Sequence, residues 1–186
     1  MMRLWYSVIL ILLFSETIFS RKKCKSTVVP RPVHTFETGP HLCFTTSGSS
    51  TLEVSTTRYK EGKHSMKWDW KSGDFITYEF KPKPIKGKEL KEGGIKLWLY
   101  NTHQLSGIGE ELTIEFLETA SSPSHSVVSL FKINLNFEGW RGIWVAYSDF
   151  KAGARWNTRE INRMKITAPN TSPPTHLLFF DLIRFV

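Results

Sequence analysis

The sequence has too little of several features to support some common classes of protein. Its 186 residues include only two cysteines, too few for a disulfide scaffold and without metal-ligand spacing. Its 12 glycines and 9 prolines follow no period, which excludes a collagen-like or low-complexity chain. The six histidines are scattered, and no Ser–His–Asp or Cys–His order indicates a nucleophilic enzyme. What the chain does have is 13% aromatic residues, which excludes a disordered chain, and a net charge of +8.

The only long apolar run lies at the N-terminus, which excludes a multi-pass membrane protein. As a helix, Leu4–Phe14 would reach about 17 Å, well short of the ~30 Å core of a bilayer. We therefore predict a cleaved secretory signal at residues 1–20, a secreted, extracellular protein and no stable membrane insertion. A basic N-terminal arm at residues 21–33 and one domain at residues 34–186 complete the predicted organisation.

Export would place the two cysteines in an oxidising compartment, where thiols tend to pair. We predict a disulfide between Cys24 and Cys43, with two unpaired thiols as the alternative. The sequence Asn170-Thr171-Ser172 is a glycosylation sequon on Asn170, although Pro173 directly after it makes its use less favourable.

Short runs of alternating apolar and polar residues dominate the rest of the chain. The clearest run is Ser65–Lys71, in which Met66, Trp68 and Trp70 share one face, so the two tryptophans are expected in the core. A second run, Phe75–Phe80, follows after a Ser-Gly-Asp turn signal, and the pair is expected to form a hairpin.

Further runs of this kind are Ile95–Tyr100, Leu112–Leu117, Val127–Phe137, Ile143–Tyr147, Ile161–Thr167 and Leu177–Val186. No segment after the predicted signal carries the apolar stripe of an amphipathic helix. About ten short strands, with turns every 8–12 residues or so, are typical of an all-β, two-sheet antiparallel sandwich of jelly-roll type.

Three groups of residues, in chain order, resemble a known family. They are Tyr59–Trp70, then Gly139–Tyr147 preceded by Leu97–Asn101, and finally Ile166–Asn170 with Phe180–Phe185. Together they resemble the N-terminal domain of chondroitin ABC lyases, polysaccharide lyases that degrade sulfated glycosaminoglycans. The resemblance implies a jelly-roll sandwich related to galactose-binding modules, and it extends over nearly all of the chain after the predicted signal.

In that family the domain precedes a helical toroid that carries the catalytic His, Tyr, Arg and Glu, and it helps to hold long glycosaminoglycan chains. The sequence ends before any such toroid, so we expect a secreted, non-catalytic module that binds a sulfated glycosaminoglycan or another acidic polysaccharide. One alternative is a truncated or fragmentary lyase that needs the missing toroid. The other is a secreted scaffold that binds a protein partner.

Aromatic rings are candidate platforms for sugars. Trp98 and Tyr100 alternate with Ile95, Leu97 and Leu99, so one of these two faces must point away from the core. We predict that Trp98 and Tyr100 bind ligand.

Basic residues are candidate contacts for acidic groups, and they gather in the N-terminal arm and in one loop, at Lys81, Lys83, Lys86, Lys88 and Lys91. A solvated loop kept soluble by its charge is the alternative. Arg141, within the second motif, is either a ligand contact or part of a structural ion pair. Nucleic acid would suit the same charges, but a secretory signal makes it a poor partner.

The resemblance to sandwiches of this shape also implies a structural Ca²⁺. The carboxylates of Glu37 and Asp181, on strands expected to be neighbours, would be ligands together with the carbonyls of Thr35, His64 and Lys67. Asp181 stands within an apolar strand, where a carboxylate needs a partner. A salt bridge from Asp181 to an Arg or Lys is the alternative.

Overall fold

A computed structural model describes residues 33–37, 44–80, 85, 91–105, 107, 110–118, 126–149, 151–152, 161–171 and 176–186. The predicted signal, the two cysteines and Lys81, Lys83, Lys86 and Lys88 lie outside these residues, as does nearly all of the predicted arm. Within the described residues, no helix is long and apolar enough to cross a lipid bilayer.

The regular secondary structure of the described residues is almost entirely strand. The strands are β1 (Val33–His34), β2 (Phe44–Thr46), β3 (Thr51–Ser55), β4 (Ser65–Asp69), β5 (Phe75–Glu79), β6 (Gly94–Asn101), β7 (Glu111–Glu118), β8 (Ser126–Asn134), β9 (Gly139–Ala146), β10 (Lys151–Ala152), β11 (Arg163–Thr167) and β12 (Leu177–Phe185). A single 3₁₀ turn, η1 (Tyr147–Asp149), follows β9.

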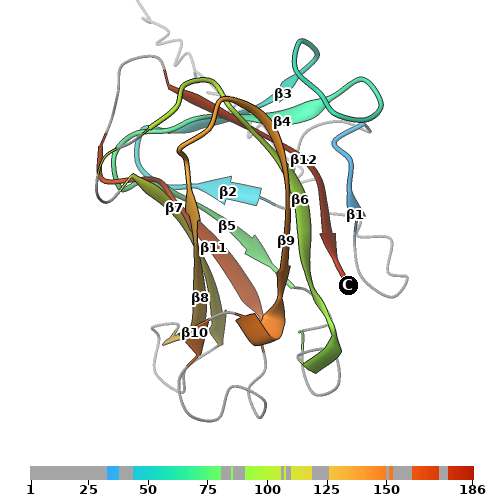
Figure 1. The fold of residues 1–186 in the computed structure, drawn as a ribbon, viewed down its shortest axis with the longest axis vertical. Coiled ribbons are helices and arrows are strands. Elements are labelled where there is room, and N and C mark those ends of the chain that lie inside the picture. The colour runs from blue at the N-terminus through green and yellow to red at the C-terminus, as the bar shows by residue number, and fades with distance from the viewer. Residues whose placement is uncertain are drawn as a thin grey trace, which may run out of the picture.

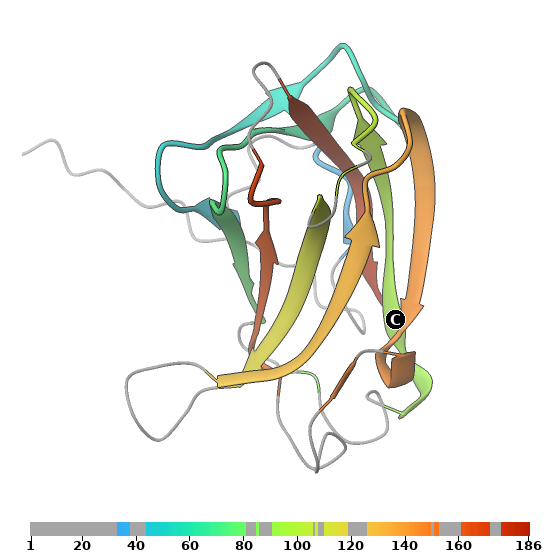
Figure 2. The same ribbon diagram turned by 60° about the vertical axis from the view of Figure 1, so that its left-hand side comes forward.

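The strands form two sheets that face each other (Figures 1 and 2). Sheet A has the order β3-β4-β12-β6-β9, with β1 also paired to β12, and Sheet B has the order β10-β8-β7-β11-β5-β2. Every strand pair is antiparallel. The predicted all-β, two-sheet sandwich is therefore confirmed.

The core fills the space between the sheets with alternate side chains from each strand. Trp68 of β4, Phe116 of β7 and Phe180 of β12 are all 0% exposed. Trp70 is 3% exposed, so the expectation that Trp68 and Trp70 belong to the core is confirmed. Burial of apolar area on this scale is the main force that holds two sheets together.

The predicted hairpin of β4 with β5 is wrong. β4 pairs with β3 and β12 in Sheet A, whereas β5 pairs with β11 and β2 in Sheet B. The turn between them therefore carries the chain from one sheet to the other. The apolar faces of both strands point into the same core, so the alternation of residues cannot distinguish a hairpin from a crossover.

β12 organises Sheet A because it pairs with three strands, β1, β4 and β6. The expectation that the first and last strands are neighbours is confirmed, since Val33 pairs with Arg184 and His34 with Ile183. Opposite β6, the register of β12 shifts between Asp181 and Arg184, which is a β-bulge. Leu182 within this bulge has a φ of 48°, in the left-handed region that most side chains avoid.

Candidate functional site

The outer face of Sheet A carries aromatic side chains. In β6, Ile95, Leu97 and Leu99 are at most 1% exposed and point into the core. Trp98 and Tyr100 alternate with them and are half-buried, so they point to the outer face. Ligand binding by these two rings stays a prediction.

The edge strand β9 adds two more tryptophans to the same face. Trp140 pairs with Tyr100 and Trp144 pairs with Lys96, so their side chains share the outer face. Trp144 is 53% exposed, the most of any large apolar side chain in the described residues. A Cβ at Gly94 would lie 2.8 Å from the Trp144 ring, so this glycine gives the indole room to lie close to the sheet.

Residues 56–64, here called the 56–64 loop, lay two cations over this face. The Arg58 Nη1 donates a hydrogen bond of 2.6 Å to the Tyr100 hydroxyl, and the guanidinium lies 4.6 Å from the ring centroid. The Lys60 Nζ lies 4.4 Å from the centroid of Trp98. Such cation–π contacts place the two charges over the rings while the side chains stay exposed.

Two carboxylates fasten the 56–64 loop by its backbone. Asp181, which is 0% exposed, accepts hydrogen bonds at Oδ2 from the backbone N–H groups of Lys60 (2.8 Å) and Glu61 (3.0 Å). Glu37 accepts at Oε1 from the N–H groups of Lys63 and His64, each at 2.9 Å. Donors aimed at both carboxylates account for the fixed position of the loop.

The environment shifts the pKa of each carboxyl in a different direction. Burial raises the pKa of Asp181, and this outweighs the N–H bonds that favour its charge. The hydrogen bond from the Lys63 N–H is the main cause that lowers the pKa of Glu37, followed by the bond to the His64 ring. The second Glu37 oxygen lies 3.1 Å from His64 Nδ1.

The five residues expected at a Ca²⁺ site come together only in part. Glu37 and Asp181 both bond to the 56–64 loop, of which His64 is the last residue, and Thr35 precedes Glu37 by two residues. Lys67 lies within β4, which pairs with β12 on one side and β3 on the other. Its side chain forms an ion pair with Glu53.

Both carboxylates have hydrogen-bond donors as partners. Backbone N–H groups donate to both oxygens of Asp181 and to Glu37 Oε1, and His64 Nδ1 lies 3.1 Å from Glu37 Oε2. In the described residues, no group of three or more His, Cys, Asp or Glu side chains is placed to hold a metal ion. These contacts satisfy both carboxylates without a cation, and a Ca²⁺ site here stays a prediction that a chelator tests. No salt bridge to Asp181, the alternative expected from the sequence, is among the described contacts. Backbone N–H groups form the hydrogen bonds of this carboxylate instead.

One end of the outer face carries two cations without acidic partners. Lys96 of β6 pairs directly with Arg184 of β12, and Lys96 also pairs with Trp144 on its other side. Both cations are exposed, and neither forms an ion pair within the described part of the chain. The sequence alone does not single out Lys96, Arg184 and Trp144 as a group, because only the pairing of distant strands makes them neighbours.

The other predicted site residues lie elsewhere. Arg141 is exposed but points to the opposite side of β9 from Trp140, and its guanidinium lies 4.1 Å from the centroid of Phe137. It forms neither a described ion pair nor part of the aromatic face. Asn170 is exposed, as an attachment site for a glycan must be, but its glycosylation stays a prediction.

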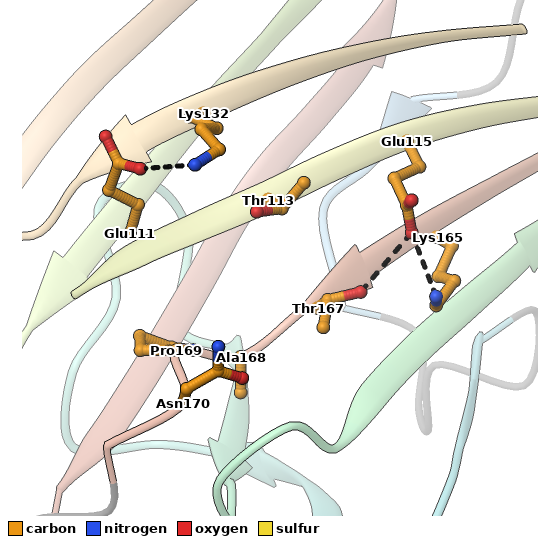
Figure 3. Close-up of a pocket in the computed structure, with 9 residues that line it drawn as sticks. All are labelled: Glu111, Thr113, Glu115, Lys132, Lys165, Thr167, Ala168, Pro169 and Asn170. Carbon is orange, nitrogen blue, oxygen red and sulfur yellow. Dashed lines mark hydrogen bonds and ion pairs between the residues drawn. The ribbon is translucent and has the colours of Figure 1, made fainter. Parts of the chain in front are cut away.

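A shallow pocket of about 270 Å³ lies on the outer face of Sheet B (Figure 3). Glu111 and Lys132 form an ion pair of 2.8 Å at one end, and Glu115 and Lys165 form one of 2.9 Å at the other. No aromatic residue lines this pocket, and a carboxylate neutralises each of its lysines. The outer face of Sheet A is therefore the stronger candidate for ligand binding.

Comparison with solved structures supports the fold. The chain is similar to a family 30 carbohydrate-binding module with a TM-score of 0.57 and 12% identity, which covers 73% of this chain and 83% of that one. It is also similar to the CBM22-1 xylan-binding domain of Paenibacillus barcinonensis Xyn10C, with a TM-score of 0.50, 13% identity and coverage of 83% and 92%. At this identity the likeness shows a shared sandwich fold.

Comparison by sequence identifies the family. The chain is 29% identical over 155 residues to a chondroitin sulfate ABC exolyase of Proteus vulgaris, covering 81% of this chain and 14% of the relative. It is 30% identical over 146 residues to a chondroitin sulfate ABC endolyase of the same organism, covering 75% and 13%. The chain thus spans only a small part of these relatives. A family model described as "Lyase, N terminal" matches residues 32–186, and the chain belongs to this family of lyase N-terminal domains.

Proposed function

We propose that this protein is a secreted carbohydrate-binding module for acidic polysaccharides of the sulfated glycosaminoglycan class, without lyase activity of its own. The observation that carries the proposal is the outer face of Sheet A. There the exposed Trp144 shares the face with the half-buried Trp98 and Tyr100, and the cations Arg58 and Lys60 lie over the latter two rings.

The chemistry of this face suits a charged sugar polymer. A flat indole offers a large apolar surface to the C–H face of a pyranose ring, and its electron-rich face attracts the polarised hydrogens there. Cations that keep their charge near water attract sulfate and carboxylate groups, with steering over about 10 Å at ordinary salt. A neutral glycan would use the rings alone.

The relatives favour the same class of ligand. They are named as enzymes that act on chondroitin sulfate, and the match lies in their N-terminal lyase domain. A solved structure with the same fold is named as a carbohydrate-binding module. Catalysis by the rest of such enzymes is consistent with a binding role for this part.

Affinity electrophoresis or calorimetry with chondroitin sulfate tests the proposal. Trp144→Ala should weaken binding at least tenfold, whereas Phe75→Ala, a half-buried aromatic on the outer face of Sheet B, should bind as the wild type does. No retention of the wild-type protein on chondroitin sulfate or heparin at physiological salt would refute the proposed function.

A lyase fragment is the second candidate, because the chain matches only 14% of the length of the exolyase. On this view a longer protein carries the activity. Ultraviolet absorbance reports the unsaturated sugars that β-elimination produces. The chain mixed with chondroitin sulfate should give no rise in absorbance, and a sustained rise that scales with protein concentration would contradict a role in binding alone.

A further inference from the structure

One row of residues crosses four strands of Sheet A on its outer face. The register of the strands places Trp144 of β9, Lys96 of β6, Arg184 of β12 and Val33 of β1 side by side. All four are exposed, Trp144 by 53% and Val33 by 42%. Strands lie about 4.8 Å apart, so the row is roughly 14 Å long. In the two adjacent rows Lys60 lies over Trp98 and Arg58 over Tyr100, so these rings are less open than Trp144.

The charges of this row are unusual for the sheet that carries them. Lys96 and Arg184 are direct cross-strand neighbours, and two like charges in that position destabilise a sheet. Four other strand cations have carboxylate partners, in the pairs Lys67–Glu53, Lys132–Glu111, Arg163–Glu79 and Lys165–Glu115, whereas Arg141 of β9 forms no described ion pair. Folding therefore gains nothing from placing Lys96 beside Arg184.

An anion between these two side chains would remove the repulsion. A guanidinium can hold two oxygens of one oxyanion, and an ammonium adds a third donor from the facing side. Trp144, the other neighbour of Lys96, offers a ring on which a sugar can stack. A sugar on Trp144 would thus direct an acidic substituent toward the two cations.

We propose that Lys96 and Arg184 form an oxyanion seat that binds a sulfate or carboxylate of a glycan stacked on Trp144. This rests on the proposed function and names the chemical group that the open row recognises. The remainder of the row, Val33, extends the surface for a second sugar unit.

Calorimetry on the whole chain with three polymers tests the seat. Chondroitin sulfate carries sulfate and carboxylate, unsulfated chondroitin carries carboxylate alone, and xylan serves as the neutral polymer. Lys96→Ala with Arg184→Ala should weaken binding of chondroitin sulfate at least tenfold and lower its salt dependence. The matched control is Lys71→Ala with Lys132→Ala, which removes the same charge from two exposed lysines outside the row and should change affinity less than twofold.

The polymers separate the sources of the anion. An equal loss on unsulfated chondroitin assigns the seat to a carboxylate, and a loss confined to the sulfated polymer assigns it to a sulfate. An equal loss on xylan, or affinities like those of the control, would overturn the seat even though the wild type binds. A wild type that binds no acidic polymer would instead refute the proposed function. The melting temperature of the double variant should equal or exceed that of the wild type, because like charges are removed.

Discussion

Replacing Asp181 by asparagine tests how the 56–64 loop is held over the aromatic face. Asp181 is 0% exposed and its two oxygens accept three backbone N–H bonds, from Lys60, Glu61 and Leu182. An amide has the same shape but only one acceptor oxygen. If that oxygen faces the loop, the Leu182 N–H meets an NH₂ group and loses its partner.

The expected cost follows from two opposing effects. A hydrogen bond to a charged group contributes about 1.5–3 kcal/mol, and an unsatisfied buried donor costs about 1–3 kcal/mol. Asparagine also removes a buried charge, and the raised pKa of Asp181 shows that burial disfavours that charge. We therefore expect Asp181→Asn to lower the free energy of unfolding by about 2 kcal/mol, less than the 3–5 kcal/mol or so of breaking a buried ion pair.

Urea denaturation in the presence of a chelator measures this cost, and calorimetry with chondroitin sulfate measures its effect on the site. Asp69→Asn is the matched control, because Asp69 is a half-buried strand residue whose side chain is 45% exposed and pairs only with Lys71 among the described ion pairs. It should cost less than about 0.5 kcal/mol. Affinity should fall for Asp181→Asn alone, since Arg58 and Lys60 would leave their rings. Equal stability of the two variants would refute the idea that Asp181 holds the loop.

Three further predictions concern His176, Gly62 and divalent cations. Burial, with help from nearby His103, lowers the pKa of His176 to about 4, while nearby Glu110 opposes this. The unfolded chain thus binds a proton at His176 that the folded chain does not, so stability is complete above about pH 6.5 and falls toward pH 4. Burial lowers the pKa of His34 to about 4 as well, so each of the two histidines contributes a loss of about 2 kcal/mol between pH 7 and pH 5. In denaturant titrations His176→Gln should therefore remove about half of this pH dependence, and a parallel fall in both proteins would contradict the assignment. Gly62→Ala should destabilise by about 1–2 kcal/mol, because φ is 66° and the new Cβ would lie 2.3 Å from Glu37 Oε1. Gly73 has a φ of 72° and open space around it, so Gly73→Ala should lower the free energy of unfolding by less than Gly62→Ala does. Equal losses would show that the Glu37 side chain moves aside at no cost in free energy. A chelator should leave the melting temperature unchanged, because N–H groups already form hydrogen bonds to the carboxylates of Glu37 and Asp181. A clear drop in melting temperature that added Ca²⁺ reverses would establish the structural ion expected from the family.

The sequence was a good guide to the fold because alternation is a local signal. The run Ser65–Lys71 places Met66, Trp68 and Trp70 on one face, and all three are buried in β4 and the residue after it. The same signal does not say which strand lies beside which. For that reason alternation predicts a hairpin between β4 and β5, although the connection crosses from Sheet A to Sheet B.

The candidate site was harder to predict because it depends on the register of distant strands. The alternation within one strand is enough to predict that Trp98 and Tyr100 share a face opposite to Ile95, Leu97 and Leu99, and their ligand binding stays a prediction. Trp144, Lys96 and Arg184 come from three strands, β9, β6 and β12, and only their pairing makes them neighbours. Asp181 was marked out by its apolar surroundings, but nothing in its strand indicates that its partners are backbone N–H groups of a loop far away in the sequence.

The bulge in β12 places both Asp181, which bonds to the 56–64 loop, and Arg184, which pairs with Lys96, on the outer face of Sheet A. Side chains alternate along a strand, so residues three positions apart, such as Asp181 and Arg184, would normally point to opposite faces. Opposite them, Trp98 and Lys96 are only two positions apart and share the outer face, so the bulge absorbs one residue of β12. Leu182 adopts its left-handed φ at this point, a conformation that costs free energy. The strain is what allows one strand both to hold the 56–64 loop through Asp181 and to place Arg184 beside Lys96. A regular strand would have turned Arg184 into the core, and the row beside Trp144 would carry one cation instead of two.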